Sequence, residues 1–160
     1  MSAIPPPPSP VHVPPDGGDT VFLGGDTYTT ILGGAQTGGA FTLLEALVPP
    51  DTGPPPHAHH AEDETFVLLD GDLTFTVGDE THVAAPGTTI FVPRGTVHSF
   101  ANVGTAPARM LFMYSPAGME GMFAEIGTPG TRGAAAPPRS MADVEAMIAI
   151  APKYHFTIGG

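Results

Sequence analysis

Residues 53–64 read Gly-Pro-Pro-Pro-His-Ala-His-His-Ala-Glu-Asp-Glu, and the histidine pair in this stretch sets what the rest of the fold must supply. His57 and His59 are two positions apart, so in an extended strand both imidazoles leave the same face, roughly 6.5 Å apart along the strand. Glu64 follows a short polar turn, and a returning antiparallel strand would bring its carboxylate back to the pair. His98 would come from a separate hairpin. Three neutral imidazoles and one carboxylate suit one divalent transition metal, namely Fe, Mn, Co, Ni, Cu or Zn.

Glycines, a proline and an asparagine frame these candidate ligands at fixed spacing. They are, in chain order, Gly71, Gly87, Pro93, Gly95 and Asn102. Together with the histidines and the glutamate, they resemble the paired motifs of the cupin superfamily, G-x5-H-x-H-x3,4-E-x6-G and G-x5-P-x-G-x2-H-x3-N. The second motif fits at every defined position. In the first, the leading Gly53 lies two residues too close to His57, but this glycine is a turn residue and not a ligand.

The resemblance implies a function as well as a fold. It implies that His57, His59, Glu64 and His98 bind the metal. The neighbouring His60 is out of phase with His59, and we expect it to face solvent. The chain is most similar to small, single-domain, quercetin dioxygenase-like cupins, in which a glutamate takes the proton of a substrate hydroxyl and O2 cleaves the ring. Carried over, Glu64 would be both a ligand and the general base.

Three functions stay open on this basis. The first is a metal-dependent dioxygenase that acts on a neutral enol, phenolic or polyketide-like small molecule. The second is a metal-dependent cyclase or isomerase of specialised metabolism with no net oxidation, and the third is a non-catalytic cupin that binds a small molecule. The chemistry of such a fold depends on its pocket and its metal, so the sequence does not separate the three.

The composition of the chain limits the classes of molecule that we expect it to bind. The formal charge is −11 with only five Lys and Arg residues, which argues against nucleic acid and anionic membranes because both demand basic patches. With no cysteine, the chain has neither disulfides nor thiolate ligands. No stretch resembles a signal peptide or a membrane span. We therefore expect a cytoplasmic protein, a homodimer, whose partner is a small-molecule substrate, together with O2 if the reaction is oxidative.

Short apolar stretches alternate with Gly- and Pro-rich turns through most of the chain. Leu73, Phe75 and Val77 alternate with threonines, which is the plainest pattern of a half-buried strand. Strand follows strand without an intervening helix, and this predicts an all-β chain that forms a single cupin jelly-roll barrel with a short C-terminal helix. We expect a Pro-rich extended leader over residues 1–18, the β-barrel over 19–116 and a C-terminal extension over 117–160.

Large apolar side chains on these strands are expected to line a substrate pocket beside the metal. The candidates are Phe66, Phe75, Phe100 and Phe112.

The C-terminal extension should contain a helix over residues 140–150 and then a final strand. Ser140, followed by Asp143 three positions later, is close to a capping box. Val144, Met147 and Ile148 form an apolar stripe, and we expect this stripe to pack on the outside of the barrel.

Overall fold

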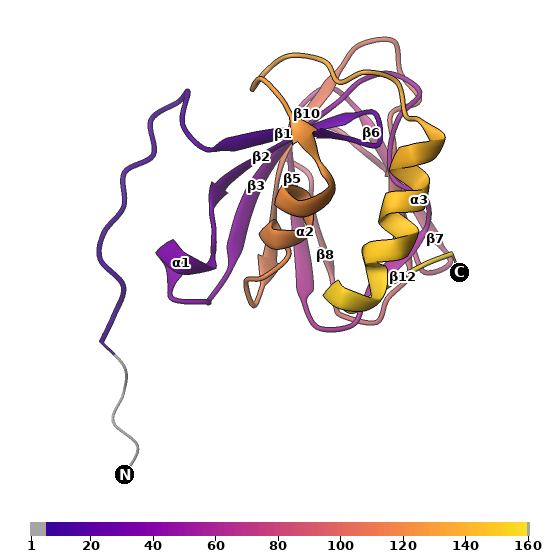
Figure 1. The fold of residues 1–160 in the computed structure, drawn as a ribbon. Helices are drawn as coiled ribbons and strands as arrows, with labels where there is room; N and C mark the ends of the chain where they lie inside the picture. The colour runs from indigo at the N-terminus through magenta and orange to yellow at the C-terminus, as the bar shows by residue number, and fades with distance from the viewer. Residues whose placement is uncertain (1–5, 160) are drawn as a thin grey trace.

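The computed structural model describes residues 6–159, which fold into two antiparallel β-sheets and a few short helices (Figure 1). The larger sheet contains, in spatial order, β11 (Thr128–Pro129), β1 (Asp19–Leu23), β2 (Asp26–Leu32), β3 (Thr42–Val48), β10 (Ala108–Ser115), β5 (Asp63–Asp70) and β8 (Thr89–Val92). The smaller sheet contains β12 (Phe156–Ile158), β4 (His57–His59), β9 (His98–Ala101), β6 (Leu73–Val77) and β7 (Glu80–Ala84). The prediction of an all-β jelly roll with a short C-terminal helix is confirmed.

The hydrophobic core lies between the two sheets. Phe66 on β5 packs against Phe75 on β6 with 5.2 Å between ring centroids, so side chains of the facing sheets interdigitate. Phe66 also stacks on Phe112 of β10 within its own sheet, with 5.9 Å between centroids. Aromatic pairs at these separations stabilise a core beyond the area that they bury.

Period-two burial along two neighbouring strands of the larger sheet determines what faces the interior. On β5 the buried side chains are Glu64, Phe66 and Leu68, as the alternation predicts. On β10 Phe112 and Tyr114 also point inward, and the register places Tyr114 directly opposite Glu64. On these two strands, the interior face therefore carries the Glu64 carboxylate among apolar and aromatic groups.

The C-terminal segment contributes a strand to each of the two sheets. α2 (Glu120–Ile126) buries Met122 and Phe123 in the core. β11 extends the larger sheet by pairing with β1, and β12 pairs with β4 in the smaller sheet. A 3-10 turn, η1 (Ala151–Tyr154), connects the last helix to β12.

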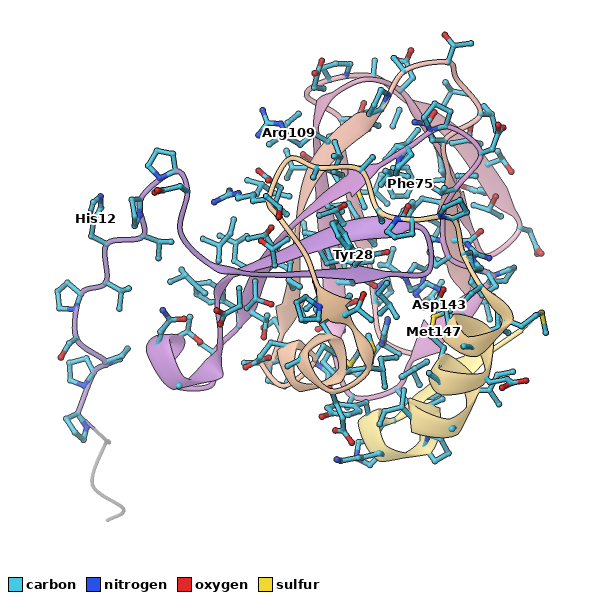
Figure 2. The ribbon with its side chains drawn as sticks, turned by 45° about the horizontal axis from the view of Figure 1, so that its top comes forward. His12, Tyr28, Phe75, Arg109, Asp143 and Met147 are labelled. Atoms are coloured by element: carbon cyan, nitrogen blue, oxygen red, sulfur yellow. The ribbon has the colours of Figure 1, made fainter. Side chains whose placement is uncertain are left out.

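The last helix, α3 (Met141–Ile150), begins as predicted but packs differently. Ser140 is its N-cap: the Ser140 hydroxyl accepts from the Asp143 amide, and the Asp143 carboxylate accepts from the Ser140 amide at 2.7 Å. The predicted stripe is wrong at Ile148, which is 58% exposed, whereas Ile150 packs on the core. Met147 lies on the side of α3 that faces the strands (Figure 2) and lines an internal cavity, so the helix does not pack simply on the outer surface.

Some short elements were not predicted from the sequence, among them β7 and α1 (Gly34–Thr37). β7 is an edge strand with four exposed residues followed by a buried one, so it shows no apolar alternation. α1 is a single turn with Gly33 at its N-cap and Gly38 at its C-cap.

Residues 6–14 of the proposed leader form neither helix nor strand, and the exposed His12 lies on this segment away from the sheets (Figure 2), while residues 1–5 lie outside the described part of the chain. Among the described residues, no helix is long and apolar enough to span a membrane.

Candidate metal centre

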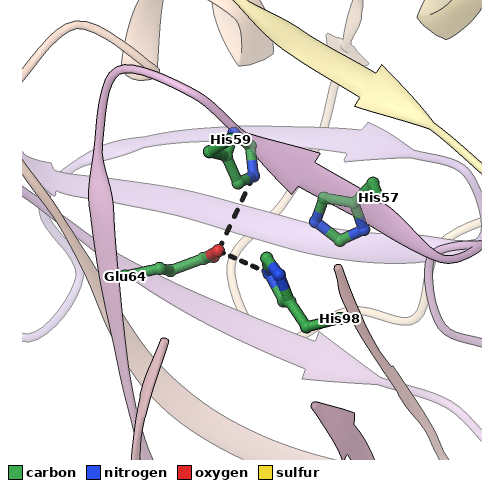
Figure 3. Close-up of side chains that lie close together, drawn as sticks. All are labelled: His57, His59, Glu64 and His98. Atoms are coloured by element: carbon green, nitrogen blue, oxygen red, sulfur yellow. Dashed lines mark hydrogen bonds and ion pairs between the residues drawn. The ribbon is translucent and has the colours of Figure 1, made fainter. Parts of the chain in front are cut away.

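Four side chains from three strands converge between the two sheets (Figure 3). His57 and His59 share the inner side of β4, and His98 comes from β9, where it pairs directly with His57. Glu64 comes from β5 in the facing sheet. The expectation that Glu64 lies on an antiparallel neighbour of the histidine strand is therefore wrong: the turn after His60 crosses from one sheet to the other, and the carboxylate reaches the histidines across the core.

The spacing of the four groups suits a single ion. Each offers one ligand atom, and these atoms all lie within 4.8 Å of one another. Glu64 Oε2 lies 2.8 Å from His98 Nε2 and 3.6 Å from His59 Nε2. The His57 and His98 rings are 4.4 Å apart between centroids. A metal bound by three imidazoles and one carboxylate needs ligand atoms at about 2.0–2.2 Å from its centre, which puts the ligand atoms roughly this far apart.

Hydrogen bonds to backbone carbonyls orient two of the three imidazoles. His57 Nδ1–H donates to the Pro55 carbonyl at 2.9 Å, and His98 Nδ1–H donates to the Thr96 carbonyl at 3.0 Å. In the neutral imidazole these bonds favour the tautomer whose Nε2 can bind a metal, which is the usual support of metal-binding histidines. In this structure His98 Nε2 instead lies at hydrogen-bond distance from Glu64 Oε2.

The third imidazole provides the test of whether a metal fits. Both ring nitrogens of His59 are buried and have no hydrogen-bond partner in the protein. Buried polar atoms are nearly always partnered, since an unmade hydrogen bond costs on the order of 1–3 kcal/mol. A metal ion on His59 Nε2 would supply the missing partner, so the donor set and its surroundings fit a metal.

Burial and mutual charge set the protonation of the cluster. Burial lowers the pKa of His57 to about 4, with further lowering from His98 and His59, and burial likewise lowers the pKa of His59. Burial opposes ionisation of Glu64, but the hydrogen bond from His98 and the nearby imidazoles bring its pKa below the ordinary value. The same carboxylate raises the pKa of His98 in spite of burial. Glu64 is therefore an anion near neutral pH, while His57 is neutral.

Three of the four ligand candidates, His57, His59 and Glu64, line a cavity of about 70 Å³. Its walls are largely apolar, and Phe100 and Phe112 of the predicted pocket residues line it. Phe66 and Phe75 do not line the cavity. Both are 1% exposed and lie in the hydrophobic core. Their alternation correctly placed them inside, but it could not distinguish the core from the wall of a cavity.

Several cavity residues were missed from the sequence. Tyr114 lies beside His59, with 5.0 Å between ring centroids. Asp26 and Tyr28, two apart on β2, line the cavity, and so do Arg139 and Met147 from the C-terminal segment. The inward parity of Tyr114 on its strand was a usable signal. No local sequence pattern indicated that Arg139 and Met147 would line this cavity.

Residues that frame the site have structural roles. Gly53 has a φ of 140°, and a side chain there would overlap the Phe100 carbonyl oxygen, so this turn requires glycine despite its shifted spacing. Gly95 has a φ of 82°, and its amide donates to the His59 carbonyl at 2.7 Å. Asn102 binds the carbonyls of Val48 and Ala106.

His60 does not join the four. It is exposed, and its Nε2 lies 3.1 Å from the Thr157 hydroxyl.

Comparison with known proteins agrees with this geometry. The cupin domain family matches residues 44–114, the segment that carries all four ligand candidates. Residues 44–114 of this chain therefore form a cupin domain. A predicted oxalate decarboxylase from Thermotoga maritima has the same fold, with a TM-score of 0.61 and 20% identity over 66% of this chain and 99% of that one.

Two further relatives match this chain over only part of their own length. The chain is 26% identical to quercetin 2,3-dioxygenase of Bacillus subtilis (strain 168) over 112 residues, which is 70% of this chain and 33% of that protein. It is 33% identical to the tetracenomycin polyketide synthase protein TcmJ of Streptomyces glaucescens over 84 residues, 52% of this chain and 56% of the relative. The matches thus span about half of the relatives' own length, or less.

Proposed function

We propose that this cupin is a metal-dependent dioxygenase that acts on a small neutral enol or phenol. The observation that carries the proposal is the group of His57, His59, Glu64 and His98 beside a largely apolar cavity, with both nitrogens of His59 lacking a partner in the protein. Such a set supports binding of one divalent transition metal, which would act as a Lewis acid, lower the pKa of a substrate hydroxyl and orient two reactants.

The residues around this set have separable tasks in the proposed reaction. Glu64 is ionised near neutral pH, so it can accept the proton of a substrate hydroxyl. Tyr114 lies opposite Glu64, and burial together with the Glu64 charge raises its pKa well above the ordinary value. Tyr114 therefore stays a neutral hydroxyl that packs on the edge of the His59 ring and limits where a planar substrate can lie.

The cavity supports a neutral substrate of about one ring. Its volume of about 70 Å³ is far below the 300–1,000 Å³ usual for drug-sized ligands. A multi-ring flavonol would require Met147 and Pro54 to move, since both residues line the same cavity. Arg139 is the one cationic residue of the lining and is exposed, so no buried cation is available there to hold a carboxylate or phosphate.

A non-oxidative reaction is the second candidate. The match to a protein of a polyketide synthase favours it, because ring closure of a polyketide also begins with removal of a proton beside a carbonyl. In that case Glu64 would take a proton from carbon or from an enol, and no O2 would be consumed.

Oxygen uptake separates the candidates. The protein would be loaded with Fe2+, Mn2+, Co2+, Ni2+, Cu2+ or Zn2+ in turn and mixed with one-ring enols and phenols in an oxygen electrode, with product detected by mass spectrometry. A dioxygenase should consume one O2 for each product molecule formed. Product without O2 uptake would establish the cyclase or isomerase, and no product with any metal would favour a binding protein.

A further inference from the structure

Asp26 is a buried carboxylate whose surroundings are unusual for a structural residue. It is 1% exposed at the start of β2, and its partners are hydroxyls: Tyr28 donates to Oδ2 at 3.1 Å and Thr52 donates to Oδ1 at 2.6 Å. The nearby Arg139 guanidinium donates instead to the backbone carbonyls of Gly24 and Gly53. Asp26 makes no ion pair among the described residues.

A purely structural role does not explain the charge. An asparagine would fill the same space without the cost of burying an anion: its one carbonyl oxygen can accept from one hydroxyl, and its amide group can donate to the other. Burial raises the pKa of Asp26 to about 6, against the lowering effect of Thr52, Tyr28 and the Arg139 charge. A carboxylate retained where its ionisation is costly, in the wall of a cavity, indicates a function for the charge.

Asp26 and Tyr28 line the same cavity as three of the candidate metal ligands, His57, His59 and Glu64. The Tyr28 ring is fixed edge-on against Phe112 and packs against Phe123, so its hydroxyl is held in place. Since that hydroxyl donates to Asp26, the groups left for a ligand at this position are oxygen lone pairs of Asp26 and Tyr28. The lining of the cavity therefore includes candidate metal ligands and, on β2, a second polar group that can accept from a hydrogen-bond donor.

We propose that Asp26, positioned by Tyr28 and Thr52, binds a hydroxyl of the substrate on the side opposite its metal-chelating oxygens. This inference rests on the proposed metal centre and specifies its substrate class: a one-ring enol or phenol that carries a second hydroxyl across the ring. A ligand without that hydroxyl would leave the Asp26 carboxylate desolvated and unpaired, which is why the discrimination should be large.

Two matched ligands test the proposal. Kojic acid, 5-hydroxy-2-(hydroxymethyl)-4-pyranone, chelates metals through its hydroxyl and ketone oxygens and carries a hydroxymethyl group across the ring. Allomaltol has a methyl group in place of the hydroxymethyl group and is otherwise the same. Calorimetric titration of the Zn2+-loaded protein at pH 7.5 should show kojic acid binding about tenfold more tightly or better, the range for a hydrogen bond to a charged group.

Variants assign the preference to Asp26. In Asp26→Asn, which keeps the size but replaces one acceptor oxygen with an amide NH2 group, the preference for kojic acid should fall to about threefold or less, since a hydrogen bond to a neutral acceptor contributes less. Asp72→Asn, at an exposed carboxylate, should keep the wild-type preference. An unchanged preference in Asp26→Asn would overturn the proposal.

The metal content, measured in the same samples, separates this proposal from the proposed function. A wild-type protein that retains no Zn2+ would contradict the metal centre, and with it this inference. A protein that retains Zn2+ yet binds kojic acid no better than allomaltol would contradict the role of Asp26 alone.

Discussion

At the scale of single residues, His59 shows most clearly what the centre lacks without a metal. His57 and His98 each satisfy Nδ1 with a backbone carbonyl, while His59 has two buried nitrogens and no partner in the protein. Glu64 accepts from His98 and lies near His59, so one carboxylate oxygen serves two imidazoles. A divalent ion among these four groups would provide a partner for His59 Nε2 and would bind the other three side chains as well.

Glu64→Gln separates a base from a ligand. The amide keeps the size and one oxygen donor but cannot take a proton, so we expect metal affinity to fall about 10–100-fold and turnover per bound metal to fall by a further 10²–10⁴, roughly the value of a positioned general base. The measurement is the rate during titration of metal into the variant, divided by the metal bound. Wild-type activity per bound metal would show that Glu64 acts only as a ligand.

Asp26 should make the stability of the protein depend on pH in a predictable direction. Its pKa is raised to about 6 in the fold, against about 3.9 in an unfolded chain. The folded state therefore holds the proton more tightly, so Asp26 costs stability above pH 6, and this cost disappears as the pH falls toward 4. A shift of about two pKa units corresponds to about 3 kcal/mol as an upper value.

We expect Asp26→Asn to raise the free energy of unfolding at pH 8 by about 1–3 kcal/mol relative to wild type and to make little difference near pH 4. Urea denaturation of both metal-free proteins across this range measures it. A stability difference that stays constant with pH would contradict the assignment, because an uncharged effect does not titrate.

For the secondary-structure elements, the sequence predicted which face of a strand is buried better than it predicted which strands pair. The alternation along β5 correctly placed Glu64, Phe66 and Leu68 on one inner face. It could not show that β5 and β4 belong to opposite sheets, because period two specifies which side of a strand is buried and not which strand lies beside it. The ligand candidates were found by spacing, whereas their arrangement across the core required the topology.

The C-terminal helix shows the same limit. Ser140 and Asp143 cap α3 as predicted, since a capping box involves only residues three apart. The contacts of the helix depend on η1 and β12, which anchor its end beside the histidine strand. Which apolar residues are buried therefore follows from distant pairing, and the prediction was wrong at Ile148.

The cap itself can be tested. Ser140→Ala removes the hydroxyl that accepts from the Asp143 amide at 3.2 Å, and should lower the free energy of unfolding by about 1 kcal/mol. Met141→Ala, one residue further on at a side chain that is 72% exposed, is the matched control and should change stability by about 0.5 kcal/mol or less. Equal effects of the two substitutions in urea denaturation would argue against the cap.

In the whole molecule, the C-terminal segment supports the strand that carries two of the ligand candidates. β4, which carries His57 and His59, pairs with β9 only through His57 and His98, while its other edge pairs along its full length with β12 near the C-terminus. Phe156 on β12 is 7% exposed and packs against the His59 ring. The C-terminal segment is thus part of the framework of the metal centre, which composition and spacing alone did not predict.

A chain that ends at Pro138 should lose both stability and metal. It lacks Phe156, a buried aromatic residue whose loss alone costs about 3–5 kcal/mol, so the melting temperature should fall by roughly 10 °C or more. Its affinity for Zn2+ should fall as well, because one edge of β4 is left unpaired. Thermal melting with and without Zn2+ measures both effects, and an unchanged melting temperature would show that α3 and β12 are not packed.

The metal content of the purified protein tests whether His57, His59, Glu64 and His98 form a metal site. Wild type, His98→Ala and His60→Ala would each be loaded with Zn2+, passed through a desalting column and analysed for metal per chain. His60 is the matched control, because it lies next to His59 yet is exposed and outside the group of four. We predict about one Zn2+ per chain in wild type and in His60→Ala and loss of most of the metal in His98→Ala, since a tetrahedral site short of one ligand is weakened. Equal metal content in the two variants would contradict the account.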